Sequence, residues 1–66
     1  RKTDPAAKAR AAEVVKQLTE SIENYEKVAA KSEAAGNAKK ASEARESAAA
    51  RKVWLEEAQK GLAEFS

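Results

Sequence analysis

The apolar residues of this chain recur every three or four positions over two long stretches, which is the spacing of an amphipathic α-helix. This pattern predicts one helix over about residues 4–35 and a second over about residues 38–64. The seam of the first helix consists of Ala11, Val15, Leu18, Ile22, Tyr25, Ala29 and Ser32, widened by Val14 and Val28. The seam of the second consists of Ala41, Ala44, Ala48, Arg51, Leu55, Ala58, Leu62 and Phe65, with Trp54 beside it. The fold class is therefore expected to be all-α.

Residue types that favour helix ends stand at the boundaries of both stretches. The side chain of Asp4 can accept from the free amides of a first turn, and Pro5 suits the first helical position. Gly36 can take the left-handed conformation that ends a helix, and Asn37 can cap the next one. Gly61 should either weaken the last turn or mark the close approach of another backbone. The chain is thus predicted to be an antiparallel two-helix hairpin, a helical coiled coil with a tight Gly-Asn turn.

Folding at this turn pairs positions of the two helices whose numbers add up to about 73, and the pairing predicts how the seam packs. Large residues then face small ones, as Tyr25 faces Ala48. Near the turn both sides are small, so the helices can approach closely there while the open end holds the bulky residues. One pairing sets Ile22 against Arg51. Either the arginine stem lies along the seam and its guanidinium reaches outward, or an acidic group on a partner receives it.

Composition limits how much this seam can bury. The chain has 66 residues, enough for a single small domain near the lower limit of independent stability. Alanine supplies 17 residues, whereas leucine, isoleucine, valine and phenylalanine together supply nine. The 13 basic and 11 acidic residues nearly cancel, which removes the charge imbalance typical of disordered chains. We therefore expect residues 1–66 to form one ordered hairpin.

The chain lacks the residues that most reactions and metal sites require. It has no cysteine and no histidine, which excludes thiolate or imidazole zinc sites, cysteine nucleophiles and histidine bases. Glu20, Glu23 and Glu26 follow helical spacing, but a two-helix hairpin offers them neither a desolvating pocket nor loop carbonyls. We predict no enzyme activity, no catalytic, metal-binding or cofactor-binding residue, and no cofactor. No apolar run approaches the ~20 residues of a membrane span and no leader is apparent, so a cytoplasmic location is favoured.

Charge is segregated along the hairpin. Residues 27–45 carry five cations against Glu33 and Glu43, a net charge of +3, whereas residues 11–26 carry Lys16 against four glutamates, a net charge of −3. This pattern predicts that an acidic helix or tail binds near the turn, with solvated surface as the alternative reading. The candidate partner-binding residues are Lys31, Lys39, Lys40, Arg45 and Arg51. Nucleic acid is disfavoured because no aromatic or glycine-rich platform accompanies these cations.

Other charged residues are expected to pair within their own helix. Glu23 with Lys27, Lys52 with Glu56 and Glu56 with Lys60 have the spacing that supports a helix by tenths of a kcal/mol.

Val53 and Trp54 are candidate apolar contact residues. Trp54 can fold back onto the seam, whereas Val53 points away from it beside Ala49 and Ala50. Scattered surface apolar residues are common, but such a strip also suits a partner or a second copy of the chain, and tryptophan is favoured as an anchor.

The stretch from Leu18 to Ala41 resembles a helical-hairpin domain of the coiled-coil and C2 domain (lethal giant discs) family. This stretch covers about a third of the chain, and its matching residues are Leu18, Ile22, Tyr25, Ala29, Ala30, Gly36, Asn37, Lys40 and Ala41. The resemblance implies a hairpin whose basic residues dock an acidic helix of an ESCRT polymer subunit. Two positions depart from the family pattern: Ser42 stands where the family places arginine, and Ser21 where it often has arginine.

Two kinds of function fit these observations. The first is a non-catalytic protein–protein interaction module that binds an acidic helical partner through the basic surface near the turn. The alternative is a structural coiled-coil or self-assembly segment of a longer protein, dimerising into a four-helix bundle, or a designed helical scaffold.

Overall fold

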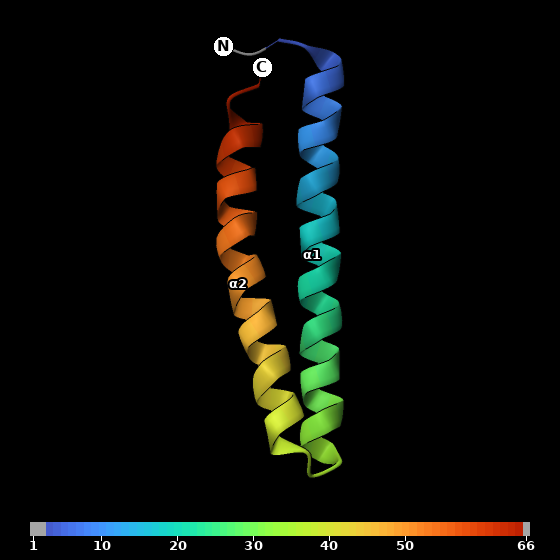
Figure 1. Cartoon of the computed structure of the whole chain (residues 1–66). Helices are drawn as coiled ribbons and strands as arrows, with labels where there is room; N and C mark the ends of the chain where they lie inside the picture. The colour runs from blue at the N-terminus through green and yellow to red at the C-terminus, as the bar shows by residue number, and fades with distance from the viewer. Residues whose placement is uncertain (1–2, 66) are drawn as a thin grey trace.

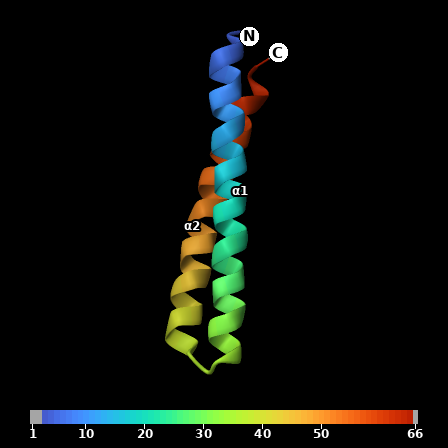
Figure 2. The ribbon, with the colours of Figure 1, turned by 90° about the vertical axis from the view of Figure 1, so that its right-hand side faces the viewer.

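The computed structural model describes residues 3–65, which form two helices connected by a short turn (Figure 1). Helix α1 spans Pro5–Ala34 and helix α2 spans Ala38–Ala63. They run antiparallel side by side, and α2 crosses α1 at a shallow angle towards the open end, as the view turned by 90° shows (Figure 2). The hairpin measures 49 × 15 × 10 Å. The predicted all-α, antiparallel two-helix hairpin is confirmed.

The first helix begins as its sequence predicts. The side chain of Asp4 accepts a hydrogen bond from the backbone N–H of Ala6 at 3.0 Å, and Pro5 occupies the first helical position. The helix therefore satisfies part of its free N-terminal amides by itself. The observed bounds lie one residue inside the predicted range 4–35, because Asp4 and Ala35 are the caps.

The turn is closed by two backbone hydrogen bonds around Gly36. This glycine has a φ of +81°, and its N–H donates to the carbonyl of Glu33 at 3.0 Å. The N–H of Asn37 donates to the carbonyl of Ser32 at 2.8 Å, which completes a Schellman motif. The side chain of Asn37 then accepts from the N–H of Lys40 at 3.1 Å, so this residue ends one helix and begins the next.

The best-buried part of the seam lies next to the turn. The buried residues are Ile22, Ala29 and Ser32 of α1 and Ala41, Ala44 and Ala48 of α2. All six belong to the predicted seam. Small side chains on both helices allow the backbones to approach closely, and this approach excludes water from residues that are themselves small.

Towards the open end the seam is only half-buried, although it holds the larger side chains. Leu18, Leu55 and Leu62 all remain partly exposed. Two helices contact such a residue from one direction only, so one flank of each large side chain stays in water. The central line of the predicted seam is therefore buried or half-buried along its whole length, with the deepest burial where its residues are smallest, but Val14 and Val28 are exposed and do not widen it.

Gly61 does not mark a close contact. A Cβ atom built at this position would have no neighbour within 4 Å, so the expectation of an approaching backbone is wrong. What remains is a residue of low helix propensity in the last two turns of α2.

Neither α1 nor α2, over the residues that the structure describes, combines the length and the hydropathy that crossing a bilayer demands.

Candidate functional site

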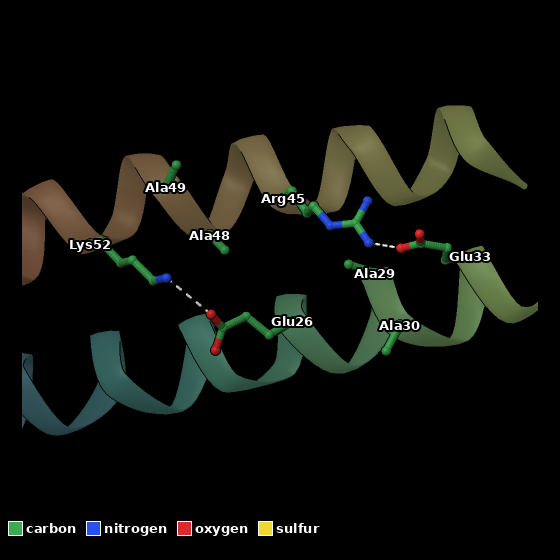
Figure 3. A pocket seen from close by; sticks show the side chains of 8 residues that line it. All are labelled: Glu26, Ala29, Ala30, Glu33, Arg45, Ala48, Ala49 and Lys52. Carbon is green, nitrogen blue, oxygen red and sulfur yellow. Dashed lines mark ion pairs between the residues drawn. The ribbon is translucent and has the colours of Figure 1, made fainter.

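One side of the hairpin carries a charged groove between the helices (Figure 3). Its volume is about 390 Å³, and it is lined by Glu26, Ala29, Ala30, Glu33, Arg45, Ala48, Ala49 and Lys52. Two ion pairs cross it: Arg45 pairs with Glu33, and the Nζ atom of Lys52 lies 3.0 Å from Oε2 of Glu26. Ala29 and Ala48, both buried, point between the two helices, whereas Ala30 and Ala49 point away from the space between them (Figure 3). The groove is thus bridged by charges that already neutralise each other.

The positions of these ion pairs follow from the heptad spacing of the seam. Glu26 and Glu33 are one heptad apart on α1, and Arg45 and Lys52 are one heptad apart on α2, so each acid meets a base across the seam. The prediction that Lys52 pairs with Glu56 is wrong, since Lys52 reaches the other helix instead. The matched heptad spacing of two acids and two bases is the sequence signal that would have revealed these interhelical pairs.

On the opposite side of the seam, Arg51 is held between aromatic rings. Its guanidinium carbon lies 4.5 Å from the ring centre of Tyr25 and 5.5 Å from the ring of Trp54. Its Nη1 atom donates to the backbone carbonyl of Ser47 at 3.1 Å. The guanidinium is thus bound within the hairpin by two cation–π contacts and a hydrogen bond, each worth about 0.5–1 kcal/mol at a site open to water.

Trp54 stands on the surface of this aromatic cluster. It does not fold back onto the seam, because 54% of its surface remains exposed. Arg51, itself a residue of the predicted seam, lies over both rings and so contacts both Trp54 and Tyr25. The largest side chain of the chain therefore has a contact with Arg51 but stays on the surface of the hairpin.

A second hollow adjoins the cluster. It has a volume of about 200 Å³ and is lined by Tyr25, Val28, Lys40, Glu43, Ala44 and Ser47. Val28 is 40% exposed at its edge. The hollow and the charged groove lie on opposite sides of the seam, because Ser47 and Ala49 flank the buried Ala48 in opposite senses around α2.

The predicted partner-binding cations are distributed around the hairpin and do not share one face. Lys31 and Lys39 are exposed near the ends of α1 and α2 that meet at the turn, and Lys40 lines the hollow. Arg45 lies in the charged groove and Arg51 in the aromatic cluster.

The cations also differ in whether their charge is already paired. Arg45, Lys52 and Lys60 each lie within 4 Å of a glutamate, with Lys60 reaching Glu57 at 3.9 Å. By contrast, four lysines near the turn have no ion-pair partner among residues 3–65: Lys27, Lys31, Lys39 and Lys40. Unpaired positive charge is therefore concentrated at the turn end.

Val53 and Trp54, although adjacent, face different directions. Val53 is 59% exposed on the outer side of α2, and Ala49 and Ala50 are exposed as well. Successive helical residues are separated by about 100° around the axis, so Val53 lies away from the aromatic cluster. The two predicted apolar contact residues belong to separate surfaces.

Among residues 3–65, no group of three or more acidic side chains is placed so that it could hold a metal ion. Comparison with models of known protein families, with curated proteins and with solved structures finds no match to this chain.

Proposed function

We propose that this chain is a non-catalytic protein–protein interaction module that binds an acidic helical partner through the lysines around its turn. The observation that carries the proposal is the unpaired charge of Lys27, Lys31, Lys39 and Lys40. These side chains are exposed and can pair with carboxylates of a partner without first breaking an ion pair of the hairpin. The turn end also has a net charge of +3 over residues 27–45, which would steer an acidic partner towards it.

The rigid turn supports the same function. Gly36 and Asn37 complete hydrogen bonds to both helices, so Lys39 and Lys40 extend from a fixed first turn of α2. Cations on a fixed scaffold lose less entropy on binding than cations on a mobile loop. The resemblance of residues 18–41 to the lethal giant discs hairpin agrees with this assignment, since that hairpin docks an acidic helix of an ESCRT polymer subunit through basic residues.

Within this surface Arg45 and Arg51 have smaller roles than Lys39 and Lys40. Arg45 is already paired with Glu33, and Arg51 already binds Tyr25, Trp54 and Ser47. A partner would have to displace these contacts to use either charge.

Charge reversal at the turn tests the proposal. The probe is a synthetic amphipathic helix with glutamates on one face and leucines on the other, followed by fluorescence anisotropy. The K39E/K40E variant should bind at least about tenfold more weakly at low ionic strength and should lose much of the salt dependence of binding. The matched control is K16E/K60E, which changes the net charge equally but away from the turn. Equal affinity of the two variants would contradict a turn-centred site.

A second candidate function is self-assembly, as a structural segment of a longer protein or as a designed scaffold. The half-buried leucines of the open end and the exposed Trp54 favour it, because a further layer of helices would cover them. Sedimentation equilibrium tests this function: a self-assembly segment should form dimers in the micromolar range, whereas a self-sufficient module stays monomeric.

A further inference from the structure

One side of the hairpin combines exposed apolar residues with a hollow whose charged lining residues are Lys40 and Glu43. We call it the aromatic side and define it by Val14, Ser21, Tyr25 and Val28 on α1 and Ala44, Ser47, Arg51 and Trp54 on α2. Val14, Ser21 and Val28 are spaced by heptads, so they share one face of α1. Val14 and Trp54 are each exposed over about half of their surface. This side continues into the hollow beside Tyr25.

We propose that the aromatic side is the interface with a second copy of this chain, in an antiparallel four-helix bundle where Trp54 of each copy enters the hollow of the other. The proposal rests on the self-assembly function given above and specifies its surface and its orientation. It does not involve the turn lysines Lys31 and Lys39, but it covers Lys40, which lines the hollow.

The charges of the aromatic side permit burial. Arg51 already has two aromatic rings and a carbonyl as partners, so its guanidinium has less solvation to lose than a free cation. Lys40 and Glu43, of opposite charge, both line the hollow. On the charged groove, a second copy would instead cover two ion pairs whose side chains are half-exposed, at a larger desolvation cost.

The size of the hairpin suits a dimer. The face that contains both helices measures 49 by 15 Å, which corresponds to about 700 Å². Stable protein interfaces bury about 800 Å² on each partner. A second copy has the same width, and a two-fold dimer that places each Trp54 in the hollow overlaps over roughly 40 Å of this length, about 600 Å² on each copy. It would also cover the open flanks of the leucines between the two helices.

The aromatic side is also complementary to itself. It carries one protruding side chain, Trp54, and one hollow, whose α2 wall consists of the small residues Ala44 and Ser47. In a two-fold dimer each contact forms twice, so one tryptophan and one hollow suffice for two anchors.

The position of these two features along the hairpin selects the orientation. In the observed register Trp54 is level with about residue 19 of α1, whereas the hollow is level with Val28, roughly 13 Å away at ~1.5 Å per residue. A parallel two-fold dimer keeps each Trp54 level with Trp54 of the other copy. An antiparallel dimer whose two-fold axis lies level with about residues 23–24 of α1 brings it to the hollow, with the two copies offset lengthwise by roughly 10 Å.

Charge favours the same orientation. With this offset, the turn end of one copy, +3 over residues 27–45, lies along the stretch 11–26 of the other, which carries −3. A parallel dimer would place the two basic ends together, and like charges at an interface oppose association.

Sedimentation equilibrium of the whole chain, with far-UV circular dichroism to verify helix content, tests the interface. The W54A variant should raise the dimer dissociation constant at least about tenfold, as expected for a tryptophan anchor. The matched control is V53A, at the adjacent position of α2, where the side chain is equally exposed but lies outside the aromatic side. This control should change the constant by less than about twofold.

Because Trp54 also contacts Arg51, W54A could weaken the dimer by destabilising the hairpin itself. A second pair of variants, which leaves Trp54 in place, distinguishes the two effects. V28E places a carboxylate at the edge of the hollow, and A30E places one in the charged groove. Only V28E should weaken the dimer. A chain that stays monomeric at every concentration would overturn the proposal together with the self-assembly function. A dimer that W54A and V28E leave intact would overturn the interface alone.

Orientation is tested with A35C, since the chain has no cysteine of its own. In the antiparallel bundle the two turns lie at opposite ends, so oxidation of this variant should yield no disulfide within the dimer. Rapid formation of disulfide-linked dimers at micromolar concentration would contradict the antiparallel arrangement.

Discussion

Next to the turn, the seam of this hairpin is built from small side chains that are buried, and towards the open end it is built from large side chains that are half-buried. Ala29, Ala41 and Ala44 are each no more than 5% exposed, yet Leu55 and Leu62, on the same seam, keep a flank in water. Both halves follow one heptad pattern and one register, so the difference lies in how close the helices can come.

The two halves differ in two contributions to stability: how closely the backbones pack and how much apolar area is buried. Close approach of the backbones gives dense packing near the turn but removes little apolar area per residue, because an alanine has little to bury. The open half has more apolar area and covers less of it. The turn half therefore sets the geometry of the hairpin, and the open half retains the surface on which a further layer of helices gains most.

The largest expected effect concerns the one bulky side chain that is buried among residues 3–65. Ile22, only 6% exposed, lies where the two halves meet. Ile22→Ala should lower the free energy of unfolding by about 2–4 kcal/mol, because it removes buried methyl groups and leaves a cavity. Leu62→Ala, in the half-buried region, should cost about half as much. Urea unfolding followed by circular dichroism measures both, and equal losses would show that the two halves are packed alike.

Enlarging an alanine should have opposite consequences in the two halves. Ala48→Leu forces extra atoms into the closely packed region and should cost about 1–3 kcal/mol. Ala58→Leu, at a half-buried position of the same seam, should change stability by less than about 0.5 kcal/mol, since its side chain can lie along an open flank. Thermal unfolding of the two variants at one chain concentration makes the comparison. A stable A48L variant would mean that the helices near the turn can move apart freely.

Replacing each of the two glycines with alanine should change the stability of the hairpin in opposite directions. Gly36→Ala places a Cβ atom at φ +81° and should cost about 1–2 kcal/mol. Gly61→Ala meets no atom within 4 Å and should stabilise α2 by about 0.5–1 kcal/mol through its helix propensity. Melting temperatures of the two variants should therefore lie on either side of the parent value. A stabilised G36A variant would refute the Schellman turn.

The smallest effect is expected from the ion pairs that cross the charged groove. Glu26→Gln or Glu33→Gln removes one carboxylate from a pair whose side chains are more than half exposed. Each substitution should cost about 0.2–1 kcal/mol at low ionic strength and almost nothing at about 1 M salt. Chemical unfolding at the two salt concentrations measures the difference, and a loss that persists in high salt would indicate a packing role.

The helices and the turn could be predicted from the sequence because local rules determine them. Asp4 and Asn37 cap helices through their own backbone neighbours, and Gly36 supplies the left-handed residue. The central line of the seam could be predicted as well, since all its residues are buried or half-buried, whereas Val14 and Val28, expected to widen it, are exposed. Even the small-to-small packing of Ser32 against Ala41 follows once the turn fixes the register.

The surfaces were predicted less well, because long side chains at the edge of a seam can reach several partners. Arg51 was expected either to reach outward along its stem or to meet an acidic group of a partner, and its contacts with the rings of Tyr25 and Trp54 were not predicted. Lys52 crosses to Glu26 although Glu56 lies at helical spacing on its own helix. Helical periodicity specifies the direction in which a Cβ atom points, but the choice among nearby rings, carbonyls and carboxylates depends on the whole packed neighbourhood.

The turn lies at one end of the hairpin, and the two helix ends at Pro5 and Ala63 lie together at the other (Figure 1). Because its two ends lie together, such an element can be inserted into a surface loop of a carrier protein without moving the two ends of that loop apart. It would then stand out as a spike 49 Å long. Its lysine-bearing tip would be held well clear of the carrier, and that distance would let it reach a target that the carrier itself could not touch.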